Sequence, residues 1–150
     1  MSGSDQKLLK AAAVLWVIWG LVHAFAGIMV LSGTSAQGFQ AIADAVDPAT
    51  LAGPYPDAVG AVLSQHAWNL LWFGVVTMVG AVFIWRGSIV AIWVTALVGG
   101  LADLGYFMFL DLPGYVHFLP GTLMTLVSSA AILLSGYAWF RSSRTPEPTV

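Results

Sequence analysis

Cysteine is absent from the 150-residue chain. The absence excludes disulfide bonds, thiolate metal sites, iron–sulfur clusters and thiol redox chemistry. Charged residues are also scarce, at 8% of the sequence, against about 25% in a typical soluble domain. So few charges cannot give the fold a polar surface, and they form no basic patch of the kind that binds nucleic acid. The composition therefore predicts a membrane protein without a nucleic-acid partner.

Several catalytic motifs are absent as well. The sequence contains no P-loop, no G-x-S-x-G and no G-x-G-x-x-G after a strand. Its long apolar runs contain no lysine, which excludes a retinal-type Schiff base. The sequence thus names no reaction and no catalytic residue, and whether the protein is an enzyme stays open.

Apolar residues make up most of the sequence, at 59% of the chain. A membrane-spanning helix needs about 20 apolar residues. Four runs reach that length, over residues 11–31, 61–85, 89–110 and 115–140. We therefore expect an all-α integral membrane protein, with one four-helix transmembrane domain over residues 11–140.

Polar segments flank this domain. Residues 1–10 form a leader, and residues 141–150 form a tail with two prolines that we expect to be disordered. The first apolar run also resembles a secretory signal with a cleavage site at residues 24–26, but its apolar pattern continues to Leu31. That continuation favours a retained helix.

The long connection over residues 32–60 has its own pattern. Phe39, Ile42 and Val46 follow a helical spacing, which predicts a short amphipathic helix over residues 36–46. Asp47 before Pro48 is typical of a helix start. We expect this connection to cover one end of the bundle.

The basic residues indicate the orientation. All five fall on one side of the predicted spans, and they are Lys7, Lys10, Arg86, Arg141 and Arg144. The positive-inside rule then predicts cytoplasmic N and C termini and an external 32–60 loop, and it argues against a dual-topology exporter. The Ala- and Gly-rich composition favours a bacterial inner (plasma) membrane. We expect the lipid bilayer as a partner, together with a homo-oligomer or a larger membrane complex.

Ionisable residues inside a bilayer are costly, and each is a functional hypothesis. Each predicted span has one in its outer half: His23, His66, Asp103 and His117. Small residues share their helical faces, as on the packing faces of transmembrane helices. We therefore expect these four side chains to point into the bundle.

Two functional interpretations follow. Three imidazoles and a carboxylate suit a metal ion, and two histidines suit the axial positions of haem b, with Asn69 supporting His66. The alternative is a pocket or proton-linked path for a small hydrophobic or quinone-like ligand, with Asn69, Trp68 and Tyr106 among its walls. Further candidates for such walls are Trp16, Trp19 and Trp72.

A third interpretation needs no ligand. His23 and Asp103 would hydrogen-bond across helices, and the protein would be a structural or accessory subunit of a larger membrane complex. The pairing geometry separates these interpretations. Convergence of all four side chains favours a site, whereas a His23–Asp103 pair with His66 and His117 pointing apart favours the structural role.

Overall fold

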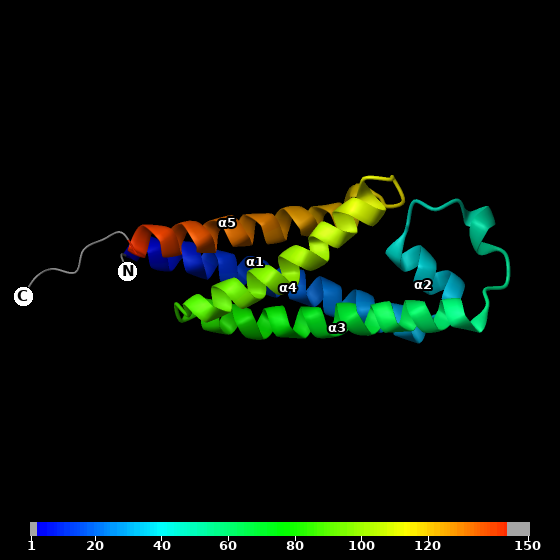
Figure 1. The fold of residues 1–150 in the computed structure, drawn as a ribbon, viewed down its shortest axis with the longest axis horizontal. Helices are drawn as coiled ribbons and strands as arrows, with labels where there is room; N and C mark the ends of the chain where they lie inside the picture. Colours follow the sequence, from blue (N-terminus) through cyan, green and yellow to red (C-terminus); the bar gives the residue numbers. More distant parts are fainter. Residues whose placement is uncertain (1–2, 144–150) are drawn as a thin grey trace, which may run out of the picture.

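The computed structural model describes residues 3–143, and its regular elements in that range are all helices (Figure 1). Their bounds are α1 (Gly3–Ser32), α2 (Ser35–Ile42), a 3₁₀ turn η1 (Pro48–Leu51), α3 (Asp57–Trp85), α4 (Ile89–Tyr106), π-helical turns η2 (Phe107–Asp111) and η3 (Phe118–Thr122), and α5 (Leu123–Ser143). Within this range, four helices are long and apolar enough to cross a membrane: α1, α3, α4 continued by η2, and α5 preceded by η3. The predicted all-α class and the four spans are confirmed.

The outward faces of these helices are strongly apolar. Val90 and Leu133 are each 71% exposed, and Leu101 is 62% exposed. Soluble monomers rarely expose apolar patches of this extent. The faces therefore suit contact with lipid, as in a transmembrane bundle.

Helix α1 lies between α3 and α5, and its contact with α3 is the closest in the bundle (Figure 1). The two helices run antiparallel, and both place buried small residues at intervals of seven. These residues are Ala13, Gly20 and Gly27 on α1, and Ala67, Gly74 and Ala81 on α3. A Cβ atom added to Gly20 would lie 2.6 Å from the Gly74 carbonyl oxygen. The backbones therefore touch, in the way that small residues permit between membrane helices.

Helix α4 changes partner along its length. Near the turn after α3, Thr95 on α4 packs against Gly80 on α3. At its other end, Asp103 contacts Ser128 on α5, and Tyr106 lies against Gly121. Figure 1 shows the resulting divergence of α3 and α4 toward the α2 end of the molecule.

The first and last helices are longer than the apolar runs predicted. Helix α1 begins at Gly3, inside the predicted leader, and α5 continues to Ser143. The two extended ends contact each other, and Arg141 Nε donates to Oδ1 of the buried Asp5 over 2.8 Å. The rest of the predicted disordered tail, residues 144–150, lies outside the described residues.

The loop after α1 closes the opposite end of the bundle. Its amphipathic helix is α2, which ends at Ile42 and leaves Val46, expected in the helix, in the loop. Asp47 caps η1 by accepting a hydrogen bond from the Ala49 amide, as its position before Pro48 predicted. Beyond α2, the Ala45 amide donates to the Tyr115 carbonyl over 3.1 Å. The His117 amide donates to Asp44 Oδ1 over 2.6 Å. These two bonds tie the loop to the connection between α4 and α5.

That connection also explains a wrong boundary. The fourth apolar run predicted a helix from Tyr115, but helical structure resumes only at Phe118. Gly114 has φ of +83°, a left-handed conformation that favours glycine, and His117 is extended. His117 therefore lies in a loop instead of on a helix.

Candidate functional site

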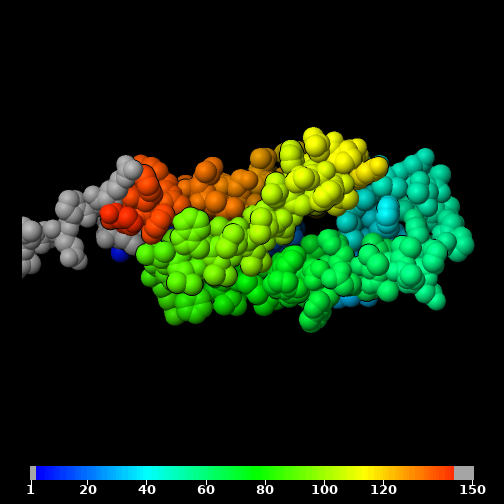
Figure 2. All heavy atoms as spheres, in the orientation of Figure 1, coloured from blue at the N-terminus to red at the C-terminus, as the bar shows by residue number. Residues whose placement is uncertain are grey.

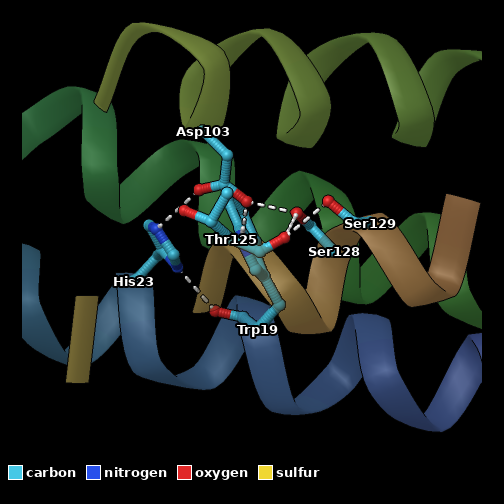
Figure 3. Close-up of polar contacts among 6 residues, drawn as sticks. All are labelled: Trp19, His23, Asp103, Thr125, Ser128 and Ser129. Atoms are coloured by element: carbon cyan, nitrogen blue, oxygen red, sulfur yellow. Dashed lines mark hydrogen bonds and ion pairs between the residues drawn. The ribbon is translucent and has the colours of Figure 1, made fainter. Parts of the chain in front are cut away.

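Asp103 of α4 is the buried carboxylate at the centre of the polar cluster, with 4% of its surface exposed. Trp19 Nε1 on α1 donates a hydrogen bond to Asp103 Oδ2 over 2.8 Å. Ser128 Oγ on α5 donates to the same oxygen. Figure 3 shows how the three side chains meet from three helices. The two donors offset part of the cost of burying a carboxylate.

His23 lies beside this carboxylate, one helical turn after Trp19. Its ring stacks on the Trp19 ring, with centroids 3.6 Å apart and planes 18° from parallel. Nδ1 is 2.9 Å from the Trp19 carbonyl oxygen. A carbonyl only accepts, so Nδ1 carries the hydrogen, and in the neutral ring Nε2 is then an acceptor.

The remaining acceptors of the pair face each other. His23 Nε2 and Asp103 Oδ1 are 3.8 Å apart, which is too far for a direct hydrogen bond. Asp103 Oδ2 already has two donors, whereas Oδ1 accepts none from the described side chains. With a neutral His23 ring and an ionised Asp103, the two facing acceptors are arranged to receive a hydrogen-bond donor from a third group.

A largely apolar cavity of about 90 Å³ adjoins the pair. His23, Asp103 and His66 supply polar groups, and the α2 residues Ala41 and Ile42 cover it. A second cavity of about 490 Å³ lies between α3 and α4. Both are lined by His23, Ile42, His66, Leu70, Asp103 and Tyr106.

The structure thus brings together part of the predicted site. His23, His66, Asp103 and Tyr106 line the same cavities. His117 is exposed in the loop and lines neither of them. Convergence of all four side chains was expected for a site, and separation of both His66 and His117 from the pair was expected for a structural role. The structure shows neither arrangement, because His66 lines the cavities with His23 and Asp103 whereas His117 lies apart.

The other predicted wall residues face elsewhere. Trp68 is 58% exposed on the outer face of α3. Asn69 is half-buried and accepts a hydrogen bond from Trp72 Nε1 over 3.1 Å. Neither of the two lines the cavities around His23.

The metal interpretation gains no support from this arrangement. Among residues 3–143, no three His, Asp or Glu side chains are placed to hold a metal ion together. His23, His66 and Asp103 do not form such a group, and the loop before η3 keeps His117 away from the cavities. The haem b interpretation stays a prediction.

The sequence did not reveal the hydrogen-bond partners of Asp103. Ser128 was not singled out from the sequence, and Trp19 was considered only as a wall candidate. Since Ser128 donates to Asp103 and not to His23, these side chains do not form a Ser-His-Asp nucleophile arrangement. The cluster is suited to binding a polar group in an apolar setting.

Comparison of the chain with known protein families, curated proteins and solved structures finds no match. The geometry of the site alone therefore carries the functional argument.

Proposed function

We propose that this protein is a transmembrane binding protein for a small amphiphile whose head group donates a hydrogen bond, such as a hydroxyl. The observation that carries the proposal is the pair of facing acceptors, His23 Nε2 and Asp103 Oδ1, at one side of an apolar cavity. A hydroxyl between them would donate to either atom. An apolar body would then lie against residues such as Val22, Leu70 and Met124.

The charges of the cavity restrict the head group further. Asp44 and Asp103 both line it, and its lining contains no Lys or Arg. An anionic head group would meet two carboxylates in a poorly solvated space, where like charges repel strongly. The site therefore favours a neutral or cationic head over a carboxylate or phosphate.

We propose that the cavity lies at the external end of the bundle, in the plasma membrane. Lys7, Lys10 and Arg86 are at the opposite end, and the positive-inside rule assigns that end to the cytoplasm. Because the chain lacks cysteine, Thr50→Cys and Lys7→Cys would each carry a single thiol. A membrane-impermeant maleimide added to intact cells should label Thr50→Cys alone; the reverse pattern would invert the topology.

The binding proposal is tested by photolabelling in proteoliposomes with hexadecanol that carries a diazirine on its chain. We expect saturable labelling of the α3 and α4 residues around the cavity, with competition by unlabelled hexadecanol. His23→Phe keeps a ring to stack on Trp19 but removes the acceptor nitrogen, so it should weaken competition several-fold. His117→Phe is the matched control, and it should label like the wild type.

Two results would count against the proposal. One is labelling spread over lipid-facing positions such as Val90 and Leu133, without competition. The other is equal competition in the His23 and His117 variants. A stable protein that behaves in this way would support the structural interpretation, in which Asp103 only joins α1, α4 and α5.

A further inference from the structure

We propose that the ligand reaches the cavity sideways from the bilayer, through a portal between α3 and α4. This inference rests on the proposed function, and it adds that the ligand comes from the lipid phase. The portal is the cavity of about 490 Å³ between these helices. Figure 2 shows the surface hollowed between α3 and the far end of α4, beside α2.

The divergence of the two helices creates this portal. At one end, Gly80 and Thr95 hold α3 and α4 in close contact. At the other end, Asp103 and Tyr106 draw α4 toward α5. The separation therefore widens toward the His23–Asp103 pair, and the portal ends on that pair.

The rim of the portal is apolar. Val62 on α3 and Phe109 on η2 both line it, and they are 67% and 70% exposed. Both belong to helices that are long and apolar enough to cross a membrane. A rim of this kind is compatible with lipid and offers little attraction to a water-soluble solute.

On the side of the 32–60 loop, a separate cavity of about 650 Å³ adjoins the portal and shares Ile42, Leu63, Phe109 and Leu110 with it. Above the smaller cavity, the loop after α2 is fixed by the bonds from Ala45 to Tyr115 and from His117 to Asp44. Ala41 and Ile42 of α2 lie beneath that loop and line the cavity. A ligand that entered the smaller cavity directly through this loop would have to break these contacts, whereas a ligand that entered through the portal would not.

Gly105 offers a way to obstruct the portal without disturbing the packing. It lines the portal, and a Cβ added there would meet no heavy atom within 4 Å. A phenyl ring at this position would occupy the passage. Because glycine disfavours helix, the substitution should not destabilise α4.

The test measures how fast the labelled hexadecanol arrives. Proteoliposomes are mixed with vesicles that contain the diazirine alcohol and are flash-photolysed at increasing delays. We expect Gly105→Phe to slow labelling of the cavity several-fold. Gly105→Ala should label at the wild-type rate, because a methyl group leaves the passage open.

Gly136→Phe is the matched control, since Gly136 on α5 is also a helical glycine with open space around it and lies away from the portal. If the wild type is labelled and Gly105→Phe is labelled at the same rate, the portal is overturned and the binding proposal stands. If Asp44→Ala is labelled faster than the wild type while the labelling rate of Gly105→Phe is unchanged, the ligand enters through the loop and not through the portal. Absence of saturable labelling in the wild type would overturn both proposals.

Discussion

At the scale of single residues, Asp103 has two differently occupied oxygens. Oδ2 accepts from Trp19 and Ser128, which fixes the carboxylate among α1, α4 and α5. Oδ1 faces His23 Nε2 at 3.8 Å. One oxygen therefore joins three helices, and the other is the acceptor to which the proposed ligand would donate.

Substitutions at Ser128 and at its neighbour Ser129 test whether the hydrogen bond to Asp103 Oδ2 stabilises the fold. Ser128 is buried and donates to Asp103, whereas Ser129 is exposed and donates only to the Thr125 carbonyl. We expect Ser128→Ala to lower the free energy of unfolding by about 1 kcal/mol, because it removes a hydrogen bond to a carboxylate. Ser129→Ala should have a much smaller effect.

Unfolding of both variants in mixed detergent micelles gives the comparison. Equal losses of stability would show that the bond between Ser128 and Asp103 contributes nothing beyond the local helix.

At the scale of elements, the α1–α3 contact depends on glycine. A Cβ on Gly74 would clash with the Gly20 backbone carbonyl, so Gly74→Ala should force the helices apart and cost about 1–3 kcal/mol. At Gly136 the same change meets open space, and it should stabilise α5 by up to about 1 kcal/mol. Thermal unfolding in mild detergent separates the two variants. Similar unfolding midpoints for the Gly74 and Gly136 variants would mean that α1 and α3 can move apart without loss of stability.

The sequence predicted these elements unevenly, for physical reasons. The apolar runs revealed four spans because the length needed to cross a bilayer is a local property of the chain. The start of α1 at Gly3 was not predicted because its first turns are polar, and hydropathy does not register the contact of Asp5 with Arg141 at the other end of the chain. The start of the fourth span was placed too early because hydropathy does not register the turn at Gly114.

At the scale of the whole molecule, the bundle combines a tight pair of helices with an open one. Glycines hold α1 against α3, while α4 leans away from α3 toward α5. The charge distribution follows the same axis, with Arg141 and Asp5 joined at one end and Asp44 bonded to the His117 amide at the other. The cavity lies at the second end, beneath α2.

The candidate site could be predicted only in part at this scale. His23, His66, Asp103 and Tyr106, which the sequence proposed for a site, line the same cavities. Trp68 and Asn69 do not line these cavities, because depth along a helix does not give the rotation of α3. His117 was misplaced because its helix begins later than its apolar run.

The central claim is that the pair of facing acceptors selects a donor head group, and native mass spectrometry tests it most directly. The protein would be released from micelles that contain either hexadecanol or hexadecyl methyl ether, which share an alkyl chain but differ in the hydroxyl hydrogen. We expect a complex of one protein with one hexadecanol, and little or none with the ether. Equal complexes with both compounds, or none with hexadecanol, would contradict it.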